Sequence, residues 1–278
     1  MRFLVIGSAS ALGGGLAEEL SRRGHAITLL AEDPRKVSED WKLRFRCHYG
    51  NISNAHVLHA AMEGADRILL ALSHPRLPGH SQQEPTQVKQ ILEANRREGK
   101  CLVFKLTSWG SVFSSSWWVM GARKKADQLV RQDPHGHLYA VGWLAESLLR
   151  IWHRNVFWVP NGLDGRILWI SRNEAVKRLC DLFLLPAPPT RETVAGSVRM
   201  SFHEAAAHVL ARSGTGRTGL VRVPFRADLR KLLPWLPEPL YAMERALWGC
   251  QVDDPESDNK QWMSSQDPFA EVLKDLDA

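Results

Sequence analysis

Residues 1–25, MRFLVIGSASALGGGLAEELSRRGH, contain the pattern that indicates the fold class most clearly. Its apolar run Phe3–Ile6 predicts a buried strand, and the spacing of apolar residues over Ala11–Arg23 predicts a helix. A second apolar run, Ala26–Ala31, follows at once and predicts another strand. This order of strand, tight turn, helix and strand indicates a unit in which two parallel strands are joined by a crossing helix.

The turn between the first strand and the helix carries the sharpest functional signal. Gly7 and Gly13 stand at the outer positions of a G-x-x-G-x-x-G pattern, and Ser10 replaces the middle glycine. A helix amino terminus after such a turn offers free N–H groups to a pyrophosphate, although the Ser10 side chain limits how closely the backbone approaches it. We interpret the turn as a dinucleotide site, with a glycine-rich turn that serves packing alone as the alternative. The expected contact residues here are Gly7, Ser10, Ala11, Leu12 and Gly13.

Further apolar runs alternate with helical patterns after residue 31. Strands are expected at Arg44–His48, Arg67–Leu72 and Cys101–Leu106, and helices at Ala55–Met62 and Gln82–Arg97. Strands that alternate with helices pair in parallel through right-handed crossovers. A sheet of this kind binds its ligand at the carboxyl ends of its strands, near the point where the strand order reverses. The strand ends are therefore the places where functional side chains are expected.

Composition restricts the class of protein. The 278 residues are 44% hydrophobic, which is enough for a sizeable core. The net charge is +6, but residues 252–278 alone carry −6, so the rest of the chain carries +12. Its arginines are scattered rather than gathered with aromatic residues, so nucleic-acid binding is not expected. The excess charge indicates either a solvated surface or attraction of an anionic cofactor or substrate.

Hydropathy and cysteine spacing restrict the class further. No stretch of about 18 uncharged apolar residues occurs, so neither a membrane span nor an export signal is expected. The cysteines Cys47, Cys101, Cys180 and Cys250 lie far apart and form no C-x-x-C pair. They predict reduced thiols in a cytoplasmic protein and no metal site.

A family resemblance extends over residues 1 to about 250. The runs VIGSASALGGGLAEEL, LLAEDPRK, HYGNISNAHVLHAAMEGADRILLALS, EPTQVKQILEANRREGKCLVFKLTS, DGRILWISRNEAV and GSVRMSFHEAAAHVLA follow one another as in the atypical short-chain dehydrogenase/reductases of the NmrA-like type, which this chain resembles. The resemblance implies a Rossmann-like, doubly wound α/β domain over residues 1–142 and a small mixed α/β substrate domain over residues 143–250. Residues 251–278 remain as an acidic tail with a short helix.

The position after the second strand bears on the cofactor. Members of this family that use NADP commonly carry an arginine where this chain has Glu32. A carboxylate repels a 2′-phosphate and accepts a hydrogen bond from a free ribose hydroxyl. The resemblance therefore implies NAD(H) in preference to NADP(H). Arg35 and Lys36 in the next turn remain within reach of a phosphate, and an exposed loop acid is the other interpretation of Glu32.

Other strand ends supply the remaining cofactor contacts that the resemblance implies. The third strand of the family usually ends in Gly-Asp, whereas this chain has Gly50-Asn51-Ile52, where Asn51 retains an acceptor oxygen for the adenine amino group. The further expected contacts are Ile52, Ala71, Leu72, Ser73, Thr107 and Ser108. The hydroxyls of Thr107 and Ser108 equally suit backbone groups at a strand end.

The usual acid/base pair of the superfamily is incomplete. Its reductases use a tyrosine with a lysine four residues later, which lowers the tyrosine pKa and holds the ribose. Here Arg123 or Lys124 takes the lysine position, while Val119 or Met120 takes the tyrosine position. Proton transfer by a tyrosine is therefore not expected. Arg123 and Lys124 are candidates to hold a ribose or an oxyanion, or form a solvated helix face, and His74 is a candidate proton donor or a plain loop histidine.

Tryptophans concentrate in the region where the resemblance places a substrate. Trp109, Trp117, Trp118 and Trp143 predict either core packing or a pocket for a flat apolar ligand. The leading hypothesis is a reductase of a small, flat carbonyl, enone or quinone. The alternatives are a redox-silent regulator or partner-binding module, and a non-redox isomerase or cyclase. A small-molecule substrate is the expected partner, and a homodimer and a protein partner both stay open.

Overall fold

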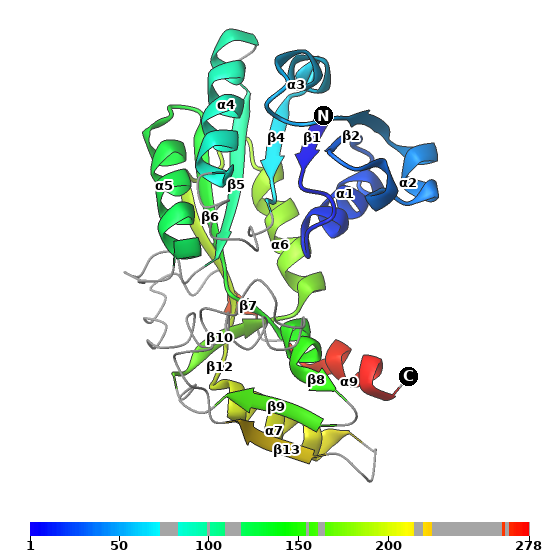
Figure 1. The fold of residues 1–278 in the computed structure, drawn as a ribbon, viewed down its shortest axis with the longest axis vertical. Helices are drawn as coiled ribbons and strands as arrows, with labels where there is room; N and C mark the ends of the chain where they lie inside the picture. Colours follow the sequence, from blue (N-terminus) through cyan, green and yellow to red (C-terminus); the bar gives the residue numbers. More distant parts are fainter. Residues whose placement is uncertain are drawn as a thin grey trace. The chain divides into compact units, whose positions relative to one another are not determined.

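The computed structural model describes residues 1–72, 83–98, 101–108, 118–153, 156–160, 165–213, 219–223, 263–264 and 267–277. The chain divides into two compact units, each described by itself below (Figure 1). The first unit consists of Met1–Thr107, Ser116–Val141 and Val176–Glu192, and the second of Ser108–Ser115, Gly142–Ala175 and Thr193–Ala278. The chain thus leaves the first unit after Val141 and returns to it for residues 176–192.

A mainly parallel sheet organises the first unit. Within this unit and among the described residues, its strand order is β6-β5-β4-β1-β2-β3. The strands are β1 (Arg2–Ile6), β2 (Ala26–Ala31), β3 (Arg46–Tyr49), β4 (Arg67–Leu70), β5 (Leu102–Ser108) and β6 (Gly136–Val141). Strand β11 (Arg191–Gly196) begins in the first unit and ends in the second, and β14 (Met263–Ser264) belongs to the second. Strand β1 pairs in parallel with β2 and β4, and β3 and β5 extend these ladders. The run from β6 to β3 is the order of a doubly wound dinucleotide-binding sheet, which confirms the Rossmann-like prediction.

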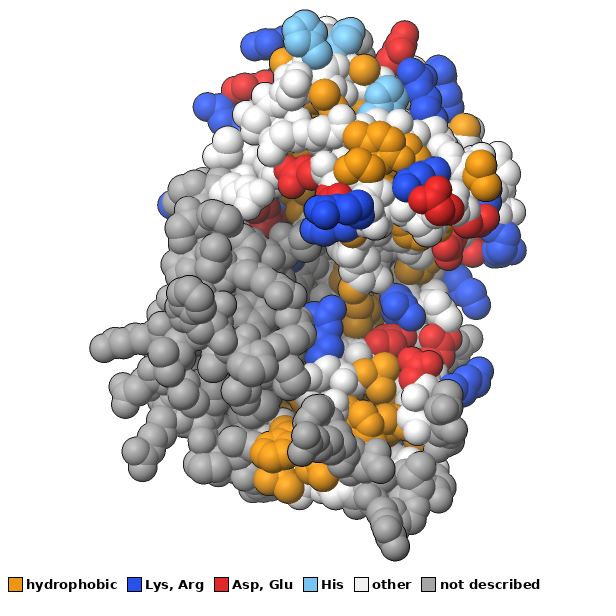
Figure 2. Space-filling model, turned by 45° about the vertical axis from the view of Figure 1, so that its right-hand side comes forward, with side chains coloured by type: hydrophobic (Ala, Val, Ile, Leu, Met, Phe, Trp, Pro, Cys, Tyr) orange, Lys and Arg blue, Asp and Glu red, His pale blue; other side chains and the backbone are white. Residues whose placement is uncertain are grey.

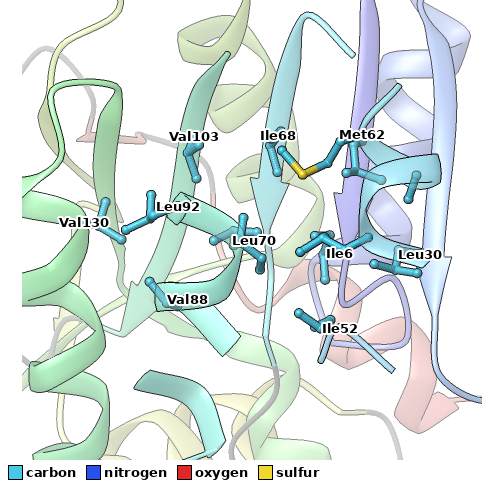
Figure 3. Close-up of a cluster of buried hydrophobic side chains, with 14 of the residues drawn as sticks. Ile6, Leu30, Ile52, Met62, Ile68, Leu70, Val88, Leu92, Val103 and Val130 are labelled. Atoms are coloured by element: carbon cyan, nitrogen blue, oxygen red, sulfur yellow. The ribbon is translucent and has the colours of Figure 1, made fainter. Parts of the chain in front are cut away.

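Helices cover both faces of this sheet. In the described chain they are α1 (Gly13–Arg22), the short 3-10 helix η1 (Pro34–Lys36), α2 (Glu39–Arg44), α3 (Ala55–Met62), α4 (Gln83–Glu98), α5 (Trp118–Gln132) and α6 (Arg172–Leu184). Helices α3, α4 and α5 pack on one face through a cluster that includes Ile6, Val88 and Val130 (Figure 3). On the other face α6 contacts β5 through Phe183 and Phe104, whose ring centroids are 4.9 Å apart.

The first helix begins later than its apolar pattern predicts. It starts at Gly13 rather than Ala11, because residues 8–12 form turns. The N–H of Ser10 donates to the carbonyl oxygen of Gly7 at 3.0 Å and closes the first of these turns. Two more residues therefore lie in the loop between β1 and α1.

The third strand also begins later than predicted, at Arg46 rather than Arg44. Helix α2 occupies the preceding residues, because the Ser38 hydroxyl caps it by accepting a hydrogen bond from the N–H of Trp41 at 3.3 Å. The indole Nε1 of Trp41 in turn donates to Glu18 of α1 at 2.9 Å. A local cap and one tertiary contact thus convert the beginning of an expected strand into a helix.

The second unit contains further, smaller sheets. Within the described residues their strand orders are β12-β10-β7 and β13-β9-β8. The elements are β7 (Trp143–Leu144), η4 (Ala145–Ile151), β8 (Trp152–His153), β9 (Val156–Pro160), β10 (Ile167–Ile170), β12 (Val198–Met200), α7 (Phe202–Arg212), β13 (Gly219–Val223) and α9 (Ala270–Asp277). Trp169, Phe202 and Phe269 meet in one core. The described part of the tail from residue 267 to 277 thereby packs on the unit itself, since Phe269 and Val272 are fully buried.

The described surface is mixed in charge. On the face shown in Figure 2, acidic and basic side chains are interspersed and form no large patch of one sign among the described residues. Several of them pair along helices, as Arg22 does with Glu19 and Arg44 with Asp40. Among the described helices, none has the length and apolar character that crossing a membrane requires.

Candidate functional site

The turn after β1 lies at the carboxyl edge of the sheet. Gly7 has a φ of +91°, and a Cβ there would overlap with the carbonyl oxygen of Ala71, which follows β4. Gly13 packs so closely that a Cβ there would overlap with the carbonyl oxygen of Gly7. The backbone geometry therefore requires glycine at both outer positions of the pattern. This turn brings the start of α1 to the ends of β1 and β4, between which the strand order reverses.

Ser10 closes the turn from within. Its Oγ accepts a hydrogen bond from the N–H of Gly13 at 3.0 Å. One of the N–H groups at the start of α1 is thus already paired with a side chain, as in a helix cap. Leu12 adds no side-chain cap, and Ala11 is exposed. An anion at this helix terminus would compete with the Ser10 hydroxyl for the Gly13 N–H.

A pocket of about 180 Å³ lies beside this turn. Its described lining is Ile6, Gly7, Ser8, Ala9, Leu30, Ala31, Glu32, Asp33, Lys36, Gly50, Ile52, Leu72, Gln83, Glu84 and Gln87. It thus combines the β1 turn, the end of β2, the loop after β3 and the beginning of α4. Of the predicted cofactor contacts, this lining contains Gly7, Glu32, Ile52 and Leu72. The described lining does not contain Ser10, Ala11, Leu12, Gly13, Arg35, Asn51, Ala71, Thr107 or Ser108.

Ser8, Asp33 and three polar residues of α4 line the pocket although the sequence does not predict them as contacts. Gln83, Glu84 and Gln87 all belong to the first turns of α4. Residues three and four positions apart share one face of a helix, so this spacing directs all three toward the same side. The helix follows a parallel strand and therefore begins at the carboxyl edge of the sheet. A polar face at such a helix start is the signal that could have indicated them.

Glu32 follows β2 and is held in place by Asn51. The Asn51 amide Nδ2 donates to Oε1 of Glu32 at 3.0 Å. The other end of that amide, Oδ1, accepts the N–H of Ser53 at 2.8 Å. Asn51 therefore connects the ends of β2 and β3 and fixes the carboxylate at the pocket. Its predicted contact with an adenine amino group stays a prediction.

The two cations of the turn after β2 are placed differently. The Arg35 side chain is 89% exposed, and its Nε lies 3.0 Å from Oδ1 of Asp33. The hydrogen bond from Arg35 lowers the pKa of Asp33, so this pair stays ionised near neutral pH. Lys36 belongs to the pocket lining. Among the described cations of this turn, Lys36 is thus the better placed to meet an anion in the pocket.

Four charged side chains are buried together where α4 and α5 meet β5. The exposed fraction of Arg123 is 5%, its Nε lies 3.2 Å from Oε1 of Glu84, and its Nη2 donates to the Leu72 carbonyl oxygen at 3.1 Å. The Nζ of Lys105 lies 2.8 Å from the same Glu84 oxygen and 2.6 Å from Oδ1 of Asp127. We call Glu84, Lys105, Arg123 and Asp127 the buried charge cluster. Two cations and two anions leave it with no net charge.

The cluster favours the ionised form of Glu84. Burial alone raises the pKa of Glu84, but the charges of Arg123 and Lys105 outweigh it, so the net direction is downward. Thr107 donates its hydroxyl to Oδ2 of Asp127 at 2.8 Å. Lys124, the other candidate at the lysine position, is exposed. Arg123 is therefore engaged by partners inside the protein, whereas Lys124 faces solvent.

Several predicted site residues are not placed by the structure. Ser73, His74, Trp109 and Trp117 lie outside the described residues, and the side chain of Trp118, the first residue of α5, is not described. Trp143 belongs to the second unit and packs edge-on against Phe202, with centroids 5.3 Å apart. In the described ranges, no three histidine, cysteine or acidic side chains gather as a metal ion would require.

No model of a known protein family matches this sequence, and no curated protein does. Solved structures do match the fold. An NADPH-dependent quinone oxidoreductase from Escherichia coli, in complex with NADPH, has a TM-score of 0.76 and 16% identity, with 99% of each chain covered. Triphenylmethane reductase from Citrobacter sp., in complex with NADP(H), has a TM-score of 0.74 and 15% identity, again with 99% of each chain covered.

A third match is a nucleoside-diphosphate-sugar epimerase from Staphylococcus aureus, with a TM-score of 0.73 and 15% identity, covering 99% of this chain and 96% of the other. The three named enzymes catalyse different reactions, so their likeness to this chain concerns its architecture. Each of the three structures matches 99% of this chain, which includes residues 1 to about 250, where the family resemblance lies. The chain therefore shares the fold of these enzymes, as the resemblance implied.

Proposed function

We propose that the first unit binds a nicotinamide dinucleotide and that the adenosine half of this cofactor occupies the pocket. The observation that supports this most directly is the place of the pocket, at the carboxyl ends of β1, β2 and β4 where the strand order reverses. The glycine turn at Gly7 and the acid Glu32 after the second strand are the features that dinucleotide sites use. Two of the matching structures hold NADPH or NADP(H).

The preferred cofactor in this proposal is NAD(H). Glu32 lines the pocket and is oriented by Asn51, so a ribose 2′-phosphate would meet a fixed carboxylate. Arg35 forms an ion pair with Asp33 and does not belong to the described lining of the pocket, so it does not offset the charge of Glu32 there. Lys36 opposes the preference, because it lines the same pocket and attracts a phosphate. Glu32 and Lys36 therefore act in opposite directions on a 2′-phosphate. We propose that the repulsion by Glu32 is the stronger effect, because Glu32 lies next to the ribose.

The proposed reaction is the reduction of a small, flat carbonyl, enone or quinone. The bound cofactor supplies the hydride, and the chain binds and orients it. The named quinone oxidoreductase and triphenylmethane reductase, which share this fold, support a reductase over other reactions. Because no tyrosine stands at the usual position of α5, we propose that the proton comes from solvent. The proposed setting is the cytoplasm, where the described cysteines remain thiols.

A redox-silent, nucleotide-binding regulator is the second candidate. It is favoured by Arg123, since the group at the usual lysine position is 5% exposed and paired with Glu84. In that case the nucleotide binds, and no substrate is reduced.

The test is a titration of the purified protein with NADH and with NADPH. The 11 tryptophans give an emission signal, and the melting temperature gives an independent one. We expect both nucleotides to raise the melting temperature, NADH at the lower concentration. No change in either signal at millimolar nucleotide would rule out both candidates. Binding without oxidation of NADH in the presence of a panel of quinones, enones and flat carbonyls would favour the redox-silent candidate.

A further inference from the structure

We propose that Arg123 is a positioning residue for the adenosine side of the pocket and that it does not touch the cofactor or the reacting atoms. This inference rests on the proposed function of the pocket as a nucleotide site. It assigns to Arg123 a role that differs from holding the ribose or an oxyanion, which the resemblance implied for this helix position.

The geometry of Arg123 supports this role. Its guanidinium extends from α5 and binds two groups of the pocket wall at once, the carboxylate of Glu84 on α4 and the carbonyl oxygen of Leu72 after β4. Both partners line the pocket, whereas Arg123 itself is absent from the described lining. A planar guanidinium with several N–H donors suits such a double contact better than an ammonium does. Arg123 thus fixes the distance between the α4 wall and the β4 edge.

Charge gives Arg123 a second effect on the same wall. Glu84 is 2% exposed, and a buried carboxylate requires compensation by nearby cations. Lys105 alone does not provide it, because its Nζ is shared with Asp127 at 2.6 Å. Removal of Arg123 would leave the buried charge cluster with one uncompensated negative charge, and Glu84 would present it to the pocket. An adenine nucleotide, which carries phosphate, would then be repelled.

The experiment compares two ligands, AMP and NADH, by calorimetry on four proteins: the unaltered chain, Arg123→Met, the double variant Arg123→Met with Glu84→Gln, and Lys125→Met as an exposed control on the same helix. We expect Arg123→Met to weaken AMP and NADH by the same factor, roughly fivefold or more. The double variant removes the uncompensated charge, so it should regain most of the AMP affinity. Lys125→Met should bind both ligands as the unaltered chain does.

The outcomes separate the possible roles. A loss of NADH affinity with unchanged AMP affinity in Arg123→Met would place Arg123 against the nicotinamide half and overturn the inference. Losses that follow the melting temperature in both Arg123 variants, with no recovery in the double variant, would also overturn it, because they indicate a general structural role. If Arg123→Met does not fold, Arg123→Gln, which also removes the charge, takes its place and must weaken AMP and NADH by the same factor. An unaltered protein that binds neither ligand would overturn the proposed function itself, and this inference with it.

Discussion

The glycine turn at Gly7 and the buried charge cluster both stand at the carboxyl edge of the same sheet, but different forces hold them. The turn is fixed by the backbone, through a positive φ and two approaches so close that only hydrogen fits in place of a side chain. The cluster is fixed by charge, with Lys105 between Glu84 and Asp127. A steric site tolerates no added atom, whereas a charge site tolerates no removed partner. Each region therefore fails under a different kind of substitution.

The largest effect is expected from Lys105→Met. The side chain of Lys105 is 1% exposed, and its loss leaves Glu84 and Asp127 with Arg123 as the remaining cation of the cluster. Breaking a buried ion pair from one side costs about 3–5 kcal/mol, because an uncompensated charge stays buried. We expect the free energy of unfolding in urea to fall by this amount.

Two further variants keep this test specific. Lys124→Met removes an exposed lysine of α5, the helix that carries Arg123 and Asp127, and it should change the unfolding free energy by less than about 0.5 kcal/mol. Asp127→Asn in the Lys105→Met background removes one of the two carboxylate charges that Lys105 compensates and should recover part of the loss. A Lys105→Met protein as stable as the unaltered chain would show that the cluster is not held by charge.

The next largest effect is expected from Gly7→Ala. The added methyl group meets the carbonyl oxygen of Ala71, and the φ of +91° disfavours any L side chain. Strain and overlap together predict a loss of roughly 2–4 kcal/mol in unfolding free energy. Gly24→Ala is the matched control, since its φ is +83° but nothing lies within 4 Å of the new atom. That variant should lose only about 1 kcal/mol. Equal losses in the two would mean that overlap at Ala71 contributes nothing.

The glycine turn could be predicted because its determinants are local. Gly7 and Gly13 lie in one short segment between an apolar strand and a helix, and this order alone indicates a dinucleotide-type turn. The strand order that the segment implies is also present in the structure. The apolar pattern does not predict where α1 begins, because turns at residues 8–12 delay the start of the helix to Gly13.

The charge cluster could not be predicted in the same way. Glu84, Lys105 and Arg123 are about 20 residues apart along the chain, and their pairing depends on how α4 and α5 pack against β5. One signal was present, since Lys105 interrupts the otherwise apolar run LVFKLTS of a central strand. A charge at such a position requires a buried partner. The sequence alone does not say which acid supplies it, so the pairing of Lys105 and Arg123 with Glu84 could not be predicted.

Glu32→Arg tests the part of the pocket at the end of β2, away from the cluster at β5. A carboxylate near contact with a 2′-phosphate at a protein surface costs about 1–4 kcal/mol, which corresponds to about fivefold to several hundredfold in affinity. The unaltered protein should therefore bind NADH more tightly than NADPH, and Glu32→Arg should reverse this order because a guanidinium donates two hydrogen bonds to phosphate. Fluorescence titration with both nucleotides measures the ratio.

Lys36→Met is the companion variant for the cofactor preference. Because Lys36 lines the pocket, its removal should weaken NADPH more than NADH. Tighter binding of NADPH than of NADH by the unaltered protein would contradict the role of Glu32 and transfer recognition of the ribose to Lys36.

Ser10→Gly should have the smallest effect, and it probes whether the steric region also has a polar component. The Oγ of Ser10 occupies the Gly13 N–H at 3.0 Å, so its removal frees that donor for a pyrophosphate and lets the backbone approach more closely. Loss of the cap to glycine costs only a few tenths of a kcal/mol of stability. We expect NADH affinity to rise by a few-fold, or about 1 kcal/mol, with almost no change in melting temperature.

Ser10→Ala is the matched control, since it frees the same N–H but keeps the Cβ. If Ser10→Ala gains as much as Ser10→Gly, the hydrogen bond is the obstacle; if only Ser10→Gly gains, the side-chain volume is. Weaker NADH binding in both would show that the hydroxyl donates to the cofactor, and the turn would then hold its ligand by a side chain as well as by its backbone.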